Sequence, residues 1–205
     1  MKYILFSDIH CDSVACEQLV DRSENADFAI GAGDFASFRR GLQDTIGRLA
    51  GIRIPTVLVP GNHESRGELI EACQGIDNFH VLHGSEIDLD GTLFWGIGGG
   101  IPITPFGAWT VDFSEEYAQR LLYSPGRNFI FVTHSPPFGC LDTLCDGQHV
   151  GSTAIRSFVE KARPSFVVCG HIHERAGQQD EIEGIPVVNA GPAGIEFEYP
   201  GRRPL

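Results

Sequence analysis

The sequence predicts an α/β fold in one domain, and three features of its pattern indicate this class. A strand–helix–strand unit opens the chain, short alternating runs with turn residues occupy its middle, and five apolar runs end abruptly in polar side chains. The chain has 205 residues, of which 42% are hydrophobic, and this is enough to bury one substantial core. We therefore expect one domain over residues 1–199, followed by a loose tail at 200–205.

The first third of the chain alternates strands with helices. Apolar β-forming runs are separated by stretches whose apolar residues recur at helical spacing, and Phe38 is the first apolar residue of the second such stretch. A helix that joins two strands of one sheet makes them parallel, so the first two strands should be parallel neighbours. The pattern Ser65-Arg66-Gly67-Glu68 is a capping box and begins the third helix. The expected strands are 2–7, 27–31 and 55–59, and the expected helices are about 12–22, 37–50 and 66–74.

The middle of the chain has a different pattern. Between residues 78 and 98, apolar and polar residues alternate around an Asp90-Gly91 turn, which predicts antiparallel hairpins. The glycine-rich run at 96–101 follows a hairpin, so it lacks the strand–loop–helix context of a dinucleotide site. Longer elements return in the C-terminal part, where Gly177 marks a turn. The expected helices there are about 114–123 and 153–162, and the expected strands are 128–133, 166–170, 185–189 and 194–199.

The net charge and the cysteine spacing limit the partners and the cellular compartment that we expect for this protein. A net charge of −12 disfavours long-range attraction to a polyanion, so we expect no extended nucleic-acid surface, although a small phosphate held by local positive charge is compatible with it. No apolar run reaches the length of a signal peptide or a membrane span. The six cysteines lack CxxC and zinc-ribbon spacing, which suits reduced thiols. We expect a cytoplasmic protein without membrane contact, and the sequence does not predict its oligomeric state.

Polar side chains follow five of the expected strands at the point where each strand ends. In α/β proteins ligands bind at the carboxyl ends of strands, so these side chains should converge. Asp8 and His10 alternate by two, as do His171 and His173, so each pair should share one face. Carboxylate, imidazole and carboxamide groups without thiolates suit divalent manganese, iron, nickel, zinc or cobalt. The candidates are too many for one ion and fit two ions that share a carboxylate. They are Asp8, His10, Asp34, Asn62, His63, His134, His171 and His173.

The motifs occur in the order Asp-x-His, Gly-Asp, Gly-Asn-His-Glu, Thr-His and Gly-His-x-His, and over about residues 3–190 they resemble those of the calcineurin-like metallophosphoesterases. The resemblance implies a four-layer α/β sandwich of two packed mixed β-sheets flanked by helices. It also implies two divalent metal ions, with manganese favoured, that share Asp34. His63 would not bind metal but would lie beside the phosphate as general acid and charge stabiliser. The remaining ligands would be Asp8, His10 and His173 at the first ion, and Asn62, His134 and His171 at the second.

The predicted reaction is the hydrolysis of a phosphate ester. Two divalent ions outweigh the charges of Asp8 and Asp34, so an acidic protein can still hold a phosphate at this site. The expected step is in-line attack on phosphorus by a hydroxide that bridges the two ions, with Asp34 and His63 as catalytic residues.

Two segments indicate the class of ester. Protein serine/threonine phosphatases carry a second aspartate and an arginine after Gly-Asp, and residues 33–39 here lack both at those places. Residues 170–174 and 188–191 resemble small phosphodiesterases, which include cyclic-nucleotide enzymes. We therefore expect a phosphodiesterase, and the alternatives are a phosphomonoesterase acting on a small molecule and a non-catalytic metal-binding scaffold.

Three further features each allow two interpretations. His149 is either a substrate-binding residue or a surface loop histidine. Phe106 and Trp109 form either an apolar wall for a nucleobase or aryl group, or a packing contact that pins a long loop. Glu64 either orients a metal ligand or is solvated near the next helix. The residues expected to bind substrate are His63, Asn62 and His149.

Overall fold

The computed structural model describes residues 1–200, in which strands and helices alternate as far as β4 and three consecutive strands occur in the middle and at the end. The first half contains β1 (Lys2–Phe6), α1 (Ser13–Ser23), β2 (Phe28–Gly31), α2 (Leu42–Leu49), β3 (Thr56–Leu58), α3 (Arg66–Ala72), β4 (Phe79–Val81), β5 (Ser85–Leu89) and β6 (Thr92–Ile97). The second half contains α4 (Glu115–Leu121), β7 (Ile130–Thr133), α5 (Thr153–Ala162), β8 (Val167–Cys169), the 3-10 turn η1 (His173–Arg175), β9 (Gln179–Ile182), β10 (Ile185–Asn189) and β11 (Ile195–Glu198).

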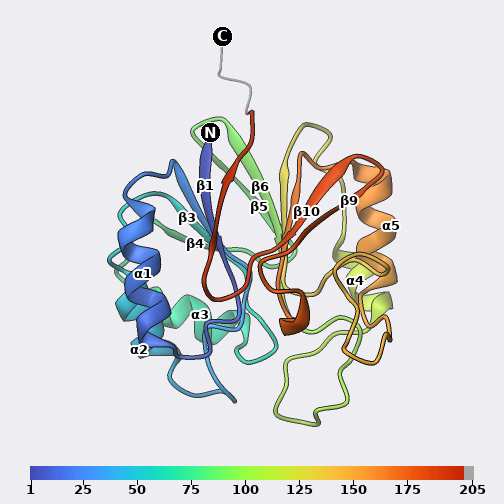
Figure 1. Cartoon of the computed structure of the whole chain (residues 1–205), viewed down its shortest axis with the longest axis horizontal. Helices are drawn as coiled ribbons and strands as arrows, with labels where there is room; N and C mark the ends of the chain where they lie inside the picture. Colours follow the sequence, from blue (N-terminus) through green and yellow to red (C-terminus); the bar gives the residue numbers. More distant parts are fainter. Residues whose placement is uncertain (201–205) are drawn as a thin grey trace.

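These elements form four layers, with helices outside two sheets (Figure 1). One sheet has five strands in the order β11-β1-β2-β3-β4, and the other has six in the order β5-β6-β7-β8-β10-β9. Helices α1, α2 and α3 cover the outer face of the first sheet, and α4 and α5 cover that of the second. Both sheets combine parallel and antiparallel pairs. The expected α/β class, with two mixed sheets flanked by helices, is confirmed.

Strand β1 shows why the central strands read as unbroken apolar runs. Ile4 and Phe6 pack against the helices α1–α3, whereas Tyr3 and Leu5 belong to the core between the sheets. A strand covered on both faces has no solvent-facing positions, so its side chains are apolar without alternation. The polar residues therefore come only after the strand ends, and this places them at the sheet edge.

Two strand pairings confirm the predictions from the sequence, and a third contradicts one. β1 and β2 are parallel neighbours, and β5 and β6 form the antiparallel hairpin around Asp90 and Gly91. The prediction that residues 79–81 belong to an antiparallel hairpin is wrong. They form β4, which pairs in parallel with β3 in the other sheet. Strand β9 was not predicted. Its exposed Gln-Asp-Glu sequence carries no apolar pattern, because it lies at the edge of its sheet.

The segment before α2 differs from the expected helix at 37–50. The helix begins at Leu42, and Ser37 and Arg40 pair with each other in two backbone hydrogen bonds of 3.0 Å. Between them Phe38 and Arg39 have φ angles of 48° and 65°, the left-handed values of a two-residue hairpin turn. Phe38 matched the helical spacing of the apolar residues, but its side chain is 64% exposed and does not pack in the core.

Two expectations concern the ends of the chain and membranes. Residues 201–205 of the expected tail at 200–205 lie outside the described residues, and the domain boundary at 199 stays a prediction. Among residues 1–200, no helix has the length and hydropathy that a bilayer crossing requires.

Candidate metal centre

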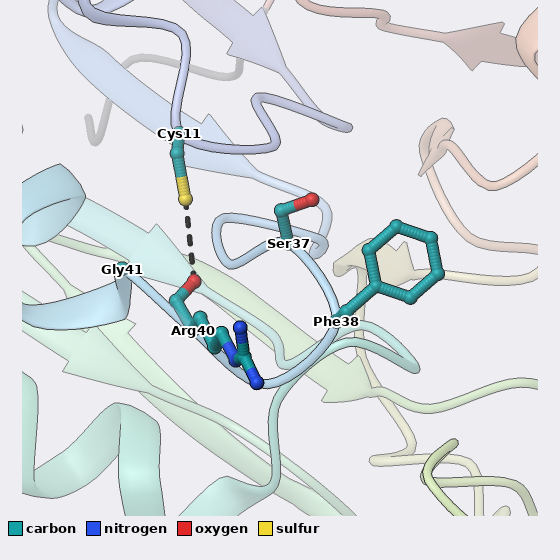
Figure 2. Close-up of a pocket in the computed structure, with 5 residues that line it drawn as sticks. All are labelled: Cys11, Ser37, Phe38, Arg40 and Gly41. Carbon is teal, nitrogen blue, oxygen red and sulfur yellow. Dashed lines mark hydrogen bonds between the residues drawn. The ribbon is translucent and has the colours of Figure 1, made fainter.

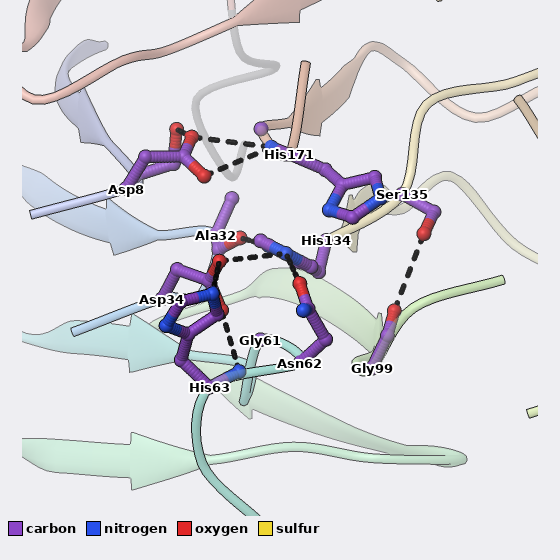
Figure 3. A network of polar contacts seen from close by, with 12 residues as sticks. Asp8, Ala32, Asp34, Gly61, Asn62, His63, Gly99, His134, Ser135 and His171 are labelled. Atoms are coloured by element: carbon purple, nitrogen blue, oxygen red, sulfur yellow. Dashed lines mark hydrogen bonds and ion pairs between the residues drawn. The ribbon is translucent and has the colours of Figure 1, made fainter. Parts of the chain in front are cut away.

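The polar residues at the strand ends meet at one edge of the two sheets, where their side chains turn toward one another (Figure 3). Asp8 follows β1, Asp34 follows β2, His63 follows β3, and His134 directly follows β7. Their possible ligand atoms form three groups, each with all members within 4.8 Å of one another. The groups share members and are therefore continuous. They are Asp8, His10 and His173; His10, Asp34 and His63; and Asp34, His134 and His171.

The backbone reaches this arrangement through left-handed residues, not through strand alternation. Asp8, His10, Asp34 and His171 have φ angles of 54°, 45°, 58° and 69°. Such values cost a non-glycine residue roughly 1–2 kcal/mol and cluster at functional sites. The expected shared face of His171 and His173 is wrong, because β8 ends at Cys169 and the two side chains join different groups. Asp8 and His10 do share a group, although both lie beyond the end of β1.

Asp34 lies at the centre of the cluster. Its carboxylate is buried, and Oδ2 faces the Nε2 atoms of His134, His10 and His63 at 3.5, 3.6 and 3.8 Å. Its Oδ1 accepts the backbone N–H of His63 at 2.9 Å. Burial raises the pKa of Asp34, but His134 and the other imidazoles more than offset this, and the pKa lies below its ordinary value. Asp34 is therefore ionised, and its Oδ2 lies between His134 on one side and His10 and His63 on the other.

His134 and Asn62 form one side of the cluster. The Nδ1 atom of His134 lies 2.7 Å from the carbonyl oxygen of Ala32, so it donates and turns Nε2 toward Asn62 Oδ1 at 3.1 Å. Burial lowers the pKa of His134, but the charge on Asp34 raises it to about 9. Burial, and then the charge on His134, lower the pKa of His171 to about 4. One of the two imidazoles is thus charged and the other neutral.

Asp8, His10 and His173 form the other side. Asp8 accepts the hydroxyl of Ser7 at 2.5 Å and the backbone N–H of His171 at 3.1 Å. A hydrogen bond to Asp8 raises the pKa of His173. His10 donates Nδ1–H to a backbone carbonyl at 3.0 Å, so its Nε2 faces the His173 Nε2 at 3.2 Å. Imidazole nitrogens and carboxylate and amide oxygens thus converge on both sides of Asp34, without thiolates. This set of groups fits divalent ions bound by mixed nitrogen and oxygen ligands.

His63 has the opposite hydrogen-bond pattern. Its Nδ1 accepts the backbone N–H of Phe38 at 2.9 Å, so in the neutral ring the proton is on Nε2. Burial lowers the pKa of His63, which favours this neutral form. A protonated Nε2 has no lone pair for a metal, although the atom lies in one of the three groups. His63 thus differs from His10 and His134, because its Nδ1 accepts a hydrogen bond whereas theirs donate one.

Glu64 matches the first of its two interpretations, because it is buried, not solvated, and holds the backbone of the proposed ligand Asp34. The side chain is buried and accepts backbone N–H groups of Asp34, Ala36 and Gly61 at 2.8, 3.0 and 2.7 Å. Burial raises the pKa of Glu64 to about 7, although the backbone donors favour its ionised form. Glu64 therefore joins the loops that follow β2 and β3. Gly61 lets these loops approach, because a Cβ atom there would overlap Asp34 Oδ1.

His149 lines the cavity onto which the cluster opens. This cavity has a volume of about 1370 Å³ and includes His10, Asp34 and His63 in its wall. His149 Nδ1 lies 2.6 Å from Asp142 Oδ1, and Asp142 is fully buried. The second oxygen of Asp142 accepts the N–H groups of Gly139 and Gly151 at 2.9 and 3.0 Å. Asp142 was missed from the sequence, since nothing in the spacing of a loop residue indicates such a contact.

Ser37 and Phe38 line both this cavity and a smaller hollow of about 580 Å³ (Figure 2). Cys11, Arg40 and Gly41 complete the smaller hollow, where the thiol of Cys11 donates to the carbonyl oxygen of Arg40 at 3.3 Å. The exposed turn at 37–40 therefore stands beside the candidate metal centre and was missed when Phe38 was placed on a helix.

Comparison with known proteins extends the sequence resemblance. The family model of the calcineurin-like phosphoesterase superfamily domain matches residues 1–202. A UPF0046 protein of Caenorhabditis elegans is 27% identical over an alignment of 199 positions, which covers 86% of this chain and 65% of that protein. The chain thus spans less than two thirds of the length of that relative.

Solved structures share the fold at low sequence identity. A protein of Thermus thermophilus superposes with a TM-score of 0.76 at 19% identity, covering 94% of this chain and 90% of that one. A structure described as a novel archaeal phosphodiesterase superposes with a TM-score of 0.55 at 18% identity, covering 93% and 84%. The match of the family model over residues 1–202, on a chain with this fold, shows that the protein belongs to the calcineurin-like phosphoesterase superfamily.

Proposed function

We propose that this protein is a metal-dependent phosphodiesterase with two divalent ions, manganese being favoured. The observation that carries the proposal is the pair of nitrogen and oxygen ligand groups on either side of the buried Asp34. Bound ions would neutralise phosphate oxygens and acidify water, which are the two functions that phosphate ester hydrolysis needs. The first ion would be held by Asp8, His10, Asp34 and His173, and the second by Asp34, Asn62, His134 and His171.

His63 stabilises charge on the phosphate in this proposal. Its Nε2–H points toward the cluster, 3.8 Å from Asp34 Oδ2, and its Nδ1 is occupied by the Phe38 N–H. A neutral ring held in this way donates a hydrogen bond but has no second proton to release. We therefore favour hydrogen bonding to the phosphate over full proton transfer to the leaving group. Asn62, fixed by His134, is placed to contact the same phosphate.

His149 is proposed to bind the substrate across the cavity. Asp142 holds its Nδ1, so Nε2 is the ring atom left for a ligand. Asp142 is itself held by two backbone N–H groups, which keeps the imidazole in place. A surface loop histidine would not require a buried carboxylate partner.

The charge of the cavity wall favours diesters over monoesters. Among the described residues that line the cavity there is no lysine and no arginine, while Glu115 and Glu174 are present. A phosphomonoester dianion needs more positive charge than a diester monoanion, and without such side chains only the metal ions would supply it. The apolar part of the wall also leaves room for a second ester substituent.

The test compares two substrates on protein whose bound metal has been counted. With manganese, bis(4-nitrophenyl) phosphate should be turned over faster than 4-nitrophenyl phosphate, and Asp34→Asn should lose both ions and activity. Asp21→Asn, on the exposed part of α1, is the matched control and should keep both. A faster monoester would identify a phosphomonoesterase. Two bound ions without turnover of either ester would identify a scaffold.

A further inference from the structure

Two aromatic rings, those of Phe38 and Trp109, stand beside His63 in the wall of the large cavity, and a third stacks on Trp109. Trp109 contacts His63 edge-on, with ring centres 4.7 Å apart, and Phe38 lies 4.9 Å from Trp109. Phe106 stacks on Trp109 at 6.4 Å with an angle of 21° between the planes. Phe138, from the loop after β7, lines the same cavity next to His149 at 5.6 Å.

Three of these four rings are exposed, and Trp109 is half-buried. Eight large hydrophobic side chains are exposed among the described residues, and four of them line this one cavity. Phe38, Phe106 and Phe138 are 64%, 55% and 43% exposed. Scattered apolar side chains on a surface are ordinary, but a group of them that lines one cavity marks a binding site. The fourth is Ile103.

Polar contacts hold the long loop at 101–112 in addition to the packing of Trp109 on His63 and Phe38. Asp112 Oδ2 accepts the N–H and the hydroxyl of Thr104 at 2.9 and 2.6 Å and the hydroxyl of Thr110 at 2.7 Å. The N–H of Val111 donates to the carbonyl oxygen of Asn62 at 2.9 Å. The loop is thus fastened to a candidate metal ligand by its backbone, and within it Phe106 remains exposed to a ligand while Trp109 forms the half-buried base on which it stacks.

The turn that carries Phe38 is held in a costly conformation. Positive φ angles at Phe38 and Arg39 are unfavourable for residues with a side chain, where Asn-Gly is preferred. An ion pair from Arg39 to Glu68 at 2.7 Å and the hydrogen bond from the Phe38 N–H to His63 hold it. Phe38 thus orients His63 through its backbone N–H and exposes its own phenyl ring to the cavity.

We propose that Phe38, Phe106, Trp109 and Phe138 form a subsite for a planar aromatic substituent of the phosphodiester, an inference that rests on the proposed function. Ring faces and edges in this arrangement favour stacked or edge-on contact with another flat ring over contact with a saturated group of equal size. The position beside His63 places that substituent next to the phosphate.

Binding, rather than turnover, tests the subsite. The manganese-loaded protein should bind phenyl methylphosphonate about two- to tenfold more tightly than cyclohexyl methylphosphonate, measured by calorimetry. Phe106→Leu keeps an apolar side chain without a ring and should remove this preference, as should Phe38→Leu, which keeps the N–H to His63. Ile70→Leu is the matched control, because Ile70 is 40% exposed on α3 and outside the cavity wall.

Equal affinities for the two phosphonates, or a preference that survives in both phenylalanine variants, would overturn the subsite. A thymidine 5′-methylphosphonate distinguishes the source of the ring: tighter binding than the phenyl ester supports a nucleobase, and weaker binding supports an aryl group. An aromatic preference without hydrolysis of any diester would support the subsite and overturn the proposed reaction. Diester hydrolysis without an aromatic preference would support the proposed reaction and overturn the subsite.

Discussion

At the scale of single residues, hydrogen-bond partners decide what each imidazole of the cluster can do. His10 and His134 donate Nδ1–H to backbone carbonyls, so when either ring is neutral its lone pair is on Nε2, which faces the carboxylate of Asp34. His63 accepts a hydrogen bond from the Phe38 N–H and carries its proton on Nε2. The same residue type is thus prepared for metal binding at two positions and for hydrogen-bond donation at the third.

Replacing His63 by alanine should lower turnover and leave the metal content unchanged. Loss of one donor aimed at developing charge typically reduces kcat by about 10²- to 10³-fold. If His63 remains neutral, the reduction should be similar for good and poor leaving groups, and a series of diesters with different leaving groups measures this. A loss that grows with the pKa of the leaving group would instead show proton transfer, and loss of bound ions would make His63 a ligand.

Metal affinity should weaken as the pH falls, and His134 is the main reason. Without metal, Asp34 raises the pKa of His134 to about 9, so below this pH the ring carries a proton that a metal ion must displace. Apparent affinity for manganese should therefore fall about tenfold per pH unit between about pH 8 and 7 for each proton displaced. Titrations at several pH values measure the slope. His80→Gln, outside the cavity wall, should leave it unchanged, and a flat profile would contradict the assignment of His134 as a ligand.

At the scale of elements, the candidate site depends on loops that are fixed to each other. The loops after β2 and β3 approach closely at Gly61, and Glu64 receives backbone N–H groups from both. The capping box of Ser65 and Glu68 then begins α3 directly behind them, as the sequence predicted. Glu64 thus supports Asp34 through the backbone without touching its side chain.

Replacing Glu64 by glutamine should destabilise the protein and weaken metal binding together. The amide keeps the size of the side chain but can turn an NH2 group toward backbone N–H groups, which leaves buried donors unpaired. We expect the free energy of unfolding to fall by about 1–3 kcal/mol, measured by urea denaturation of the metal-free protein. Glu71→Gln, exposed on α3, is the control for the same chemical change. Unchanged stability in the Glu64 variant would show that its hydrogen bonds are dispensable.

At the scale of the whole molecule, the proposed ligands come from both sheets. Asp8, Asp34 and Asn62 follow strands of the first sheet, whereas His134 and His171 follow strands of the second. The apolar core between the sheets brings these strand ends together over large distances in the sequence. Ions bound here would join the two sheets at their common edge.

Adding metal should therefore raise the thermal stability of the entire protein. A ligand that binds only the folded state at a hundred times its Kd adds about 2.7 kcal/mol, which corresponds to a rise in Tm of several degrees for a chain of this size. Calorimetry with manganese and after chelation measures the difference. Asp34→Asn should abolish it, and an equal rise in that variant would place the binding elsewhere.

The sequence alone determined the fold class, most of the elements and the set of candidate ligands. Strand β1 shows the reason: an apolar run buried on both faces ends where polar residues begin, so the sheet edge is visible in the chain itself. The Asp90-Gly91 turn and the capping box at Ser65 are equally local, because each depends on residues next to one another.

Only the tertiary structure decided which of these residues meet. His171 and His173 lie two apart yet join different groups, and Asp8 contacts the backbone of His171, 163 positions away. Phe38 matched a helix by spacing but lies in a strained turn beside His63, and Asp142 holds His149 without any sequence signal. Local patterns reflect which backbone conformations and burial each residue favours, whereas contacts between distant residues exist only after the two sheets have packed.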